Sequence, residues 1–394
     1  MPLSKNLAAL FLLIALASCS GNDATGPNPH PQPSPNRLAL GNRHVCAVRA
    51  VDIACWGRGT EGQLGIGVTP VDTTPAVIAG APALISLVSG PTHTCGLEAT
   101  RVAWCWGSNT YGELGSSNAD QQCGATTCQM SPVPAADGML FSELAAGLDF
   151  TCGLTMVGTV YCWGLNDTGQ LGNASTGSAC GGLRCSLAPV IAAQGKTFLT
   201  ITAGQSHICG LDQQGVAWCW GYEALPIPGG HPNPSFLPNP RKVTGAPAFN
   251  RIKAGGYHTC ALTESGAAWC WGIDALGAGT SKLESAKPVP VSGSHRFEEL
   301  AAARFSSCGR TANGQVFCWG PNPDGEIGNL PVGSTSRFDV PTIIQGAMVF
   351  QTVAGGGSTY CGVTDLGQTA CWGRGIEGQL GSGHASSTAP VLVP

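Results

Sequence analysis

Cysteine thiols offer the most chemistry in this sequence, because a thiol can bind a metal, attack a substrate or form a disulfide. The 394-residue chain contains 19 of them. Fourteen occur as seven pairs, nine residues apart in the first pair and ten in the others, and each pair is followed by Trp-Gly. The pairs are Cys46 and Cys55, Cys95 and Cys105, Cys152 and Cys162, Cys209 and Cys219, Cys260 and Cys270, Cys308 and Cys318, and Cys361 and Cys371.

The pair at Cys152 and Cys162 shows what this spacing does. Residues 151–155 and 159–163 are short β-prone runs on either side of a turn at Gly158, which is typical of a hairpin. Folding the hairpin places the two cysteines opposite each other, and directly opposed residues have Cβ atoms about 4.5–5.5 Å apart. That separation is close to what a disulfide requires. We therefore expect one disulfide across each of seven hairpins.

Four further cysteines form two Cys-x4-Cys loops, at Cys123 and Cys128 and at Cys180 and Cys185. One interpretation is a zinc site shared by the two loops. Zinc sites more often use Cys-x2-Cys knuckles, and thiols oxidise outside the cytoplasm. We expect two loop disulfides and no metal or other cofactor, which leaves only Cys19 unpaired.

Histidine also recurs, two residues before the first cysteine of four pairs, at His44, His93, His207 and His258. A ring of imidazoles could bind a metal or act in catalysis. However, the same place is taken by Phe150, Ser306 and Thr359 in the other units. We therefore expect each histidine to make a structural hydrogen bond within its own unit.

Carboxylates give no sign of catalysis. Glu61, Glu113, Glu326 and Glu377 lie in or beside glycine-rich turns, where a carboxylate can accept backbone N–H bonds, and they are spread over the chain rather than paired as glycosidic catalysis requires. The sequence contains neither Gly-x-Ser-x-Gly nor His-Glu-x-x-His. We predict that the protein is not an enzyme and has no catalytic residues.

The elements that position these residues belong to a repeat. The tryptophans of the Cys-Trp-Gly triplets are separated by 50, 57, 57, 51, 48 and 53 residues, which defines seven units. A Gly-x-Leu-Gly turn follows the triplet in most units, with Ile327 in place of leucine in the sixth, and units four and five are expected to lack it.

Both faces of each hairpin are apolar, because Cys152, Leu154, Val160 and Cys162 share one face and Trp163 lies on the other. A sheet covered on both faces needs a neighbour on each side, which a propeller supplies. An open solenoid is the alternative. The first unit has no Pro-x-x-Val strand before it, and residues 389–393 at the C-terminus could supply one. The sequence thus predicts an all-β, seven-bladed propeller closed by a C-terminal strand that completes blade one.

One phrase is shared by units such as 254–272 and 146–172: Ala-Gly-x-x-His-x-Cys-x-Leu, then Gly-x-x-x-Cys-Trp-Gly-x-Asn-x-x-Gly-Gln-Leu-Gly. It resembles the repeat of the regulator-of-chromosome-condensation (RCC1) superfamily, and the resemblance covers residues 37–394. It implies a seven-bladed propeller. The paired cysteines are a departure, because the eukaryotic members do not show them systematically.

The N-terminus predicts export. Lys5 precedes an apolar run at residues 7–17 that is shaped like a secretory signal. Leu16, Ala17, Ser18 and Cys19 resemble the lipobox of bacterial lipoproteins, which implies cleavage before Cys19 and acylation of its thiol; an ordinary signal peptide is the alternative. We expect a signal peptide at 1–18, a lipidated cysteine and Pro-rich tether at 19–36, and the propeller at 37–394. The predicted location is the bacterial outer membrane or cell surface.

The composition narrows the class of partner. The formal charge is −4, only 11% of residues are charged, and the cations form no basic stripe, so nucleic acid is an unlikely ligand. We expect a monomer, held to the membrane only by its lipid, that binds an unknown envelope protein or glycan. Weak candidates for that contact are Tyr222, His231, Phe236 and Leu237 in the Pro-rich insertion at 222–240.

Three other functions are weighed against binding. The resemblance implies nucleotide exchange on a small GTPase, but a signal peptide and disulfides point away from the compartment of such GTPases. Secreted relatives of the family include a propeller that inhibits β-lactamase, so an enzyme inhibitor is one alternative. An envelope hydrolase or lyase is the other, and an acid–base cluster at one mouth of the ring would favour it.

Overall fold

The computed structural model describes residues 37–116, 120–174, 178–180, 182–222, 238–280, 283–330, 332–333 and 335–394. The signal peptide, Cys19, the tether, His231, Phe236 and Leu237 lie outside these residues. The described residues form thirty strands and one short 3-10 helix, η1 (Ala136–Gly138). None of the helical structure described is long and apolar enough to cross a membrane.

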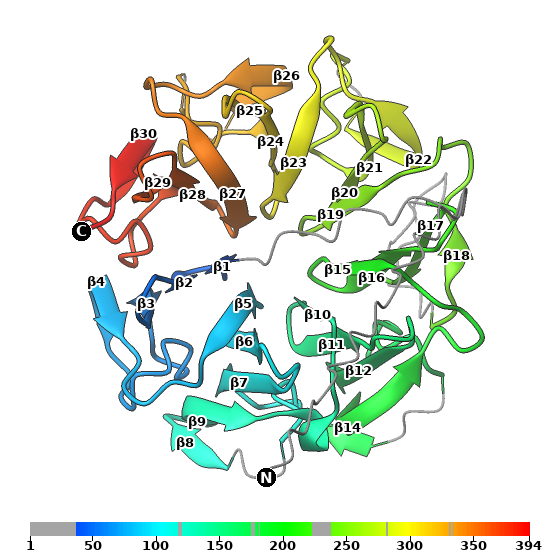
Figure 1. The fold of residues 1–394 in the computed structure, drawn as a ribbon, viewed down its shortest axis with the longest axis vertical. Helices are drawn as coiled ribbons and strands as arrows, with labels where there is room; N and C mark the ends of the chain where they lie inside the picture. Colours follow the sequence, from blue (N-terminus) through cyan, green and yellow to red (C-terminus); the bar gives the residue numbers. More distant parts are fainter. Residues whose placement is uncertain are drawn as a thin grey trace, which may run out of the picture. The chain divides into compact units, whose positions relative to one another are not determined.

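Seven antiparallel sheets are arranged around a central axis, so the predicted all-β, seven-bladed propeller is confirmed (Figure 1). The innermost strands are β1 (Leu38–Leu40), β5 (Leu84–Ser89), β10 (Glu143–Ala146), β15 (Thr200–Ala203), β19 (Arg251–Ala254), β23 (Phe297–Ala302) and β27 (Phe350–Gly356). The second strands are β2 (His44–Val48), β6 (His93–Glu98), β11 (Phe150–Leu154), β16 (His207–Leu211), β20 (His258–Leu262), β24 (Ser307–Thr311) and β28 (Thr359–Thr364).

The third strand of each blade carries the Cys-Trp-Gly triplet. These strands are β3 (Ile53–Arg58), β7 (Ala103–Ser108), β12 (Val160–Leu165), β17 (Ala217–Gly221), β21 (Ala268–Ile273), β25 (Val316–Pro321) and β29 (Thr369–Arg374). The outer strands are β4 (Val71–Val77), β9 (Thr126–Pro134), β14 (Leu183–Ala192), β18 (Arg241–Lys242), β22 (Glu284–Pro290), β26 (Arg337–Ile343) and β30 (Ser386–Leu392). In blades two and three, β8 (Gln121–Cys123) and β13 (Ser178–Cys180) extend the sheet beyond the outer strand.

Ring closure differs from the prediction. The C-terminal strand β30 pairs with β29 of its own blade, with Cys371 opposite Val391, while β4 already supplies the outer strand of blade one, with Cys55 opposite Ala76. The Pro-x-x-Val strand therefore follows its hairpin rather than preceding the next one. Each blade is continuous in sequence, and no strand is exchanged at the join.

Side-chain packing closes the ring instead. Seven clusters of buried residues each combine two neighbouring blades, and one of them joins Trp56 of blade one to Cys361, Cys371 and Leu380 of blade seven. This arrangement follows from the alternation of side chains, which directs the disulfide of a blade toward one neighbour and its tryptophan toward the other. All seven of these tryptophans are at most 1% exposed.

Disulfides, which the cysteine spacing predicts, are present. Seven join directly opposed residues of the second and third strands, with Cα atoms 4.0–4.1 Å apart. Cys123–Cys128 and Cys180–Cys185 form separate disulfides within their loops. Their sulfurs are therefore not free to form the shared zinc site weighed above.

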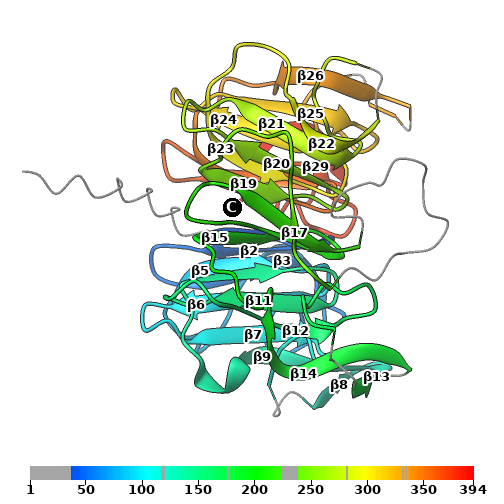
Figure 2. The same cartoon turned by 90° about the vertical axis from the view of Figure 1, so that its right-hand side faces the viewer.

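Because successive strands run in opposite directions, the loops divide between two faces. The mouth face carries the loops from innermost to second strand and from third to outer strand, and the hairpin face carries the turns from second to third strand. Figure 2 views the ring from its side and shows β8 and β13 on the same side of it. Both belong to connections between a third and an outer strand, so they lie on the mouth face.

Candidate functional site

The histidines do not form a site; they connect neighbouring blades. His93 Nε2 lies 2.9 Å from Thr151 Oγ1 of the next blade, and the Thr151 hydroxyl donates to the Glu113 carbonyl at 2.8 Å. His93 Nε2 must therefore be the donor, and its buried Nδ1 has no hydrogen-bond partner among the described residues. The expected hydrogen bond is real, but it crosses between blades, so the prediction of a bond within each unit was wrong.

Three other histidines repeat this arrangement, at His44–Thr94, His207–Thr259 and His258–Ser307, with separations of 2.7–3.0 Å. Burial lowers the pKa of His44 and His207 to about 4 and that of His93 and His258 to about 3. The imidazoles are therefore neutral and enclosed at neutral pH, and they cannot accept a proton there as general bases.

The glycine-rich turns also have a structural role. Glu113 and Glu326 each accept a backbone N–H of their own turn at 2.8 Å, from Tyr111 and Asp324. The fifth unit keeps part of the turn. Ala275 accepts a hydrogen bond from the Trp319 indole at 3.0 Å, as the glycine-rich turns of other units do from the tryptophan of the next blade. The prediction that this unit lacks the turn is corrected to that extent.

Glu61 and Glu377 do not accept backbone bonds as Glu113 does. Arg58 pairs with Glu61 at 3.1 Å, and Arg43 of blade one pairs with Glu377 of blade seven at 3.1 Å. Glu61 is therefore paired within its own loop, whereas Glu377 connects blades seven and one, and arginines neutralise both carboxylates.

One acidic cluster lies between blades two and three. Burial, helped by Glu113 and Asp167, raises the pKa of Asp149 to about 7. Glu113 itself is fully buried and is hydrogen bonded by the Ser108 hydroxyl and the Tyr111 N–H. Because Glu113 is out of reach of a substrate, this cluster does not supply the accessible acid–base pair that a hydrolase needs.

The site that remains is the mouth of the central channel. One residue of each blade lines the mouth, just after the end of the innermost strand. These seven residues are Asn42, Pro91, Leu148, Gln205, Gly256, Arg304 and Gly357. They surround a depression of about 90 Å³. It continues into a channel lined by the innermost strands, with small side chains such as Ala254 and Ala302 and the charged side chains Glu143 and Lys253.

Backbone hydrogen bonds fix this ring of loops. Leu148 N donates to Gln205 O, Gln205 N to Gly256 O, Gly256 N to Arg304 O and Arg304 N to Gly357 O, at 2.8–3.2 Å. Pro91 has no N–H and so cannot donate in the same way to Leu148. The mouth is thus a rigid collar over blades three to seven.

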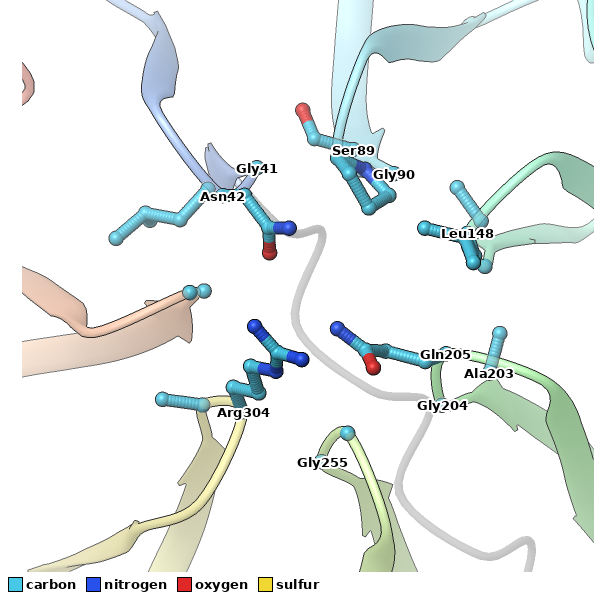
Figure 3. A pocket seen from close by; sticks show the side chains of 18 of the residues that line it. Gly41, Asn42, Ser89, Gly90, Leu148, Ala203, Gly204, Gln205, Gly255 and Arg304 are labelled. Atoms are coloured by element: carbon cyan, nitrogen blue, oxygen red, sulfur yellow. The ribbon is translucent and has the colours of Figure 1, made fainter. Parts of the chain in front are cut away.

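Polar side chains point into the mouth. Figure 3 shows the guanidinium of Arg304 and the amides of Asn42 and Gln205 directed toward the same space from three different blades. Arg304 lies 4.9 Å over the Phe305 ring and 5.9 Å from the Tyr257 ring, and these two rings stack at 5.6 Å. Arginine and large aromatic residues are the types enriched where protein interfaces gain most of their binding energy.

Sequence reasoning missed these residues. Arg304, Tyr257 and Phe305 occupy the two variable positions between the Ala-Gly step and the histidine position of the repeat, and only the closed ring brings the seven copies together. Of the predicted candidates, Tyr222 follows β17 on the mouth face and donates its backbone N–H to Ser206 O at 2.8 Å. The others lie outside the described residues.

Comparison with known sequences finds the regulator of chromosome condensation (RCC1) repeat at residues 84–113, 141–170 and 249–277, and a second model of this repeat at 157–211. The chain is 28% identical over 247 residues to the ultraviolet-B receptor UVR8 of Arabidopsis thaliana, covering 61% of this chain and 53% of UVR8. It is 27% identical over 194 residues to the human E3 ubiquitin-protein ligase HERC2, covering 47% of this chain and 4% of HERC2. The matched region is therefore about half of UVR8 and a small part of HERC2.

Solved structures share the fold. Prp20p of Saccharomyces cerevisiae, described with its binding to Gsp1p and histones, superposes with a TM-score of 0.73 at 23% identity, covering 89% of this chain and 87% of that chain. Human WBSCR16 superposes with a TM-score of 0.74 at 19% identity, covering 88% of this chain and 94% of that chain. The similarity shows that these proteins share the propeller fold with this chain.

Proposed function

We propose that this chain of RCC1 repeats is a non-catalytic scaffold that binds a protein partner through its mouth face while a lipid on Cys19 holds it at the bacterial envelope. The observation that carries the binding part is the mouth, where Arg304, Tyr257 and Phe305 form a contiguous group on a rigid collar. A rigid surface loses little conformational entropy when a partner binds.

Two observations support a protein partner over a glycan. Prp20p is described with its binding to Gsp1p and histones, and it has also been solved bound to Kap60, so one protein with this fold has several protein partners. Aromatic and arginine side chains around a concave mouth suit a protrusion from a protein surface. A glycan ligand is an outcome that the experiment below can reveal.

The envelope location rests on the N-terminal sequence and on the disulfides. Nine disulfides in one chain are typical of an oxidising compartment. The lipobox-like residues before Cys19 support acylation, and the tether to residue 36 would separate the propeller from the membrane.

A capture experiment tests the binding proposal. The full chain, purified in detergent under oxidising conditions, is used to capture proteins from envelope extracts. We expect Tyr257→Ala with Phe305→Ala to weaken capture by about 2 kcal/mol or more, roughly thirtyfold in Kd. The matched control is Val157→Ala on the hairpin face, where the side chain is 77% exposed.

The outcomes separate clearly. A protein captured by the wild type and the control but lost by the double variant supports binding at the mouth face. Equal capture by both variants, or capture that depends on added glycan alone, contradicts it. Deleting residues 223–240 in parallel tests whether the Pro-rich insertion contributes.

A further inference from the structure

Arginines on the mouth face differ in their surroundings. Four of them contact carboxylates: Arg43 with Glu377, Arg58 with Glu61, Arg337 with Asp274 and Arg374 with Asp324, at 3.1–3.5 Å. Arg304 differs. In the part of the chain that the structure describes, no carboxylate lies within ion-pair distance of its guanidinium, although Arg304 lines the depression at the channel mouth.

Arg304 is also held in position. Its guanidinium lies over Phe305 and near Tyr257, and its backbone N–H donates to Gly357 O at 2.8 Å. Gly256 allows this close fit, because a Cβ there would fall 2.6 Å from the Arg304 carbonyl oxygen. A guanidinium stacked on aromatic rings keeps its planar N–H groups available for two parallel bonds to one carboxylate.

Amides complete the set of donors. The side chains of Asn42 and Gln205 reach into the mouth from blades one and four, and Arg304 reaches it from blade six (Figure 3). Each amide can donate an N–H to an anion in the centre of the mouth. The combination of one fixed cation and two amide donors matches a carboxylate.

The source of the carboxylate follows from the kind of partner. A folded protein presents carboxylates mainly as the side chains of aspartate and glutamate, which accept hydrogen bonds at both oxygens.

We propose that the channel mouth binds the side-chain carboxylate of an acidic residue presented by the protein partner, with Arg304 as the charged anchor and Asn42 and Gln205 as additional donors. This inference rests on the proposed function, because it assumes that a partner docks on the mouth face. It adds the chemical identity of the group that enters the mouth.

The test uses small probes, so that it does not depend on identifying the partner. Blocked tripeptides acetyl-Gly-Glu-Gly-amide and acetyl-Gly-Gln-Gly-amide are titrated into the isotope-labelled full chain, and the backbone amide signals of the mouth loops are followed by NMR. We expect saturable shifts with the glutamate peptide and at least tenfold weaker binding of the glutamine peptide, since hydrogen bonds to charged groups are worth about 1.5–3 kcal/mol.

Arg304→Gln should abolish the difference between the two peptides. Its control, Arg296→Gln, makes the same charge change at the other end of β23, where Arg296 is exposed on the hairpin face, and should leave the difference unchanged. Peptide mapping of the disulfides and the thermal melting temperature establish that both variants are folded.

Three results would overturn the inference. They are equal affinity for the two peptides, an unchanged preference in Arg304→Gln, and binding only of a tripeptide with a free C-terminal carboxylate. If the Tyr257 and Phe305 variants still abolish partner capture in that case, the scaffold function stands and only the carboxylate assignment fails.

Discussion

Trp56 donates its indole N–H to the carbonyl oxygen of Gln379 at 2.9 Å, although the two residues are 323 positions apart. Five other tryptophans make the same bond to the preceding blade, as Trp163 does to Glu113 O at 3.0 Å. Blades one and seven are therefore joined as the other blades are, with Gly381 against Trp56. The join between the ends of the propeller is an ordinary blade interface.

This bond predicts an order among tryptophan variants. Trp56→Phe removes the indole donor and part of a fully buried side chain, and we expect a loss of about 1–3 kcal/mol in the free energy of unfolding. Trp271 is the comparison, because its buried indole N–H has no partner among the described residues. Trp271→Phe should cost less, since it removes no hydrogen bond to any described residue. Denaturant unfolding of both variants measures the difference, and equal losses would contradict the role given to the bond.

The hairpin disulfides should stabilise each blade separately. Replacing Cys152 and Cys162 together by alanine opens a loop of about eleven residues, for which chain entropy alone gives roughly 2–3 kcal/mol. Both sulfurs are fully buried, so a cavity adds to the loss. Replacing Cys123 and Cys128 opens a shorter loop at the edge of the sheet and should cost less. Unfolding curves of the two double variants compare them, and the reverse order would be inconsistent with this account.

Acid should weaken the histidine links. The folded pKa of His93, about 3, lies below the value of about 6.5 for an unfolded chain, so the unfolded state binds the extra proton between these values. The neutral histidine therefore makes its full contribution to the free energy of unfolding above pH 6.5. As the pH falls below 6.5, that contribution is lost by roughly 1 kcal/mol per pH unit. Substitution by phenylalanine, which blade three already has at Phe150, should remove this dependence.

Buried carboxyl groups change the free energy of unfolding with pH in the opposite direction. The test therefore compares the wild type with His93→Phe. The pKa of Asp149 and of Glu326 is raised to about 7 by burial, so their contribution is present at low pH and is lost as the pH rises through 7. These effects are common to the wild type and His93→Phe and cancel in the difference. The measurement is the free energy of unfolding of both proteins from pH 4.5 to 7, with His384→Phe at an exposed position as control. Parallel curves for the wild type and His93→Phe would refute the prediction.

Lipid anchoring gives a prediction that does not depend on the propeller. Cys19→Ala removes the thiol that the proposed acylation needs, so the protein should lose its label in cells fed a radioactive fatty acid and should leave the membrane fraction. The nine disulfides should still form, because Cys19 belongs to none of them. Label retained by the variant would exclude Cys19 as the acylated residue.

Much of the blade could be predicted from the sequence because it depends on local rules. The pairing of Cys152 with Cys162 follows from a hairpin of fixed length, and the opposite directions of the disulfide and Trp163 follow from strand alternation. The position of the last strand could not be predicted in this way, because a Pro-x-x-Val strand lies between two hairpins and could pair with either. The structure shows that it pairs with the hairpin before it.

Contacts between units were harder to predict. Each histidine bonds to the residue one position after the equivalent place in the next unit, such as Thr94 or Thr151. Where phenylalanine replaces the histidine, at Phe150, that residue is the apolar Ile208 of the same buried cluster. The sequence therefore contains the correlation between each histidine position and its partner. The correlation is visible only when each unit is compared with the next one, one position further along. The channel mouth depends on ring closure as well, which explains why Arg304 did not stand out.

Crosslinking in intact cells tests the central claim, that the mouth face is the surface that binds. A photoreactive benzoylphenylalanine is introduced at position 148 in the mouth and, in a second strain, at position 157 in the turn of the same blade on the hairpin face. We expect a discrete protein adduct from position 148, competed by unmodified protein, and none from position 157. An adduct from position 157 without one from position 148 would show that the partner binds the opposite face.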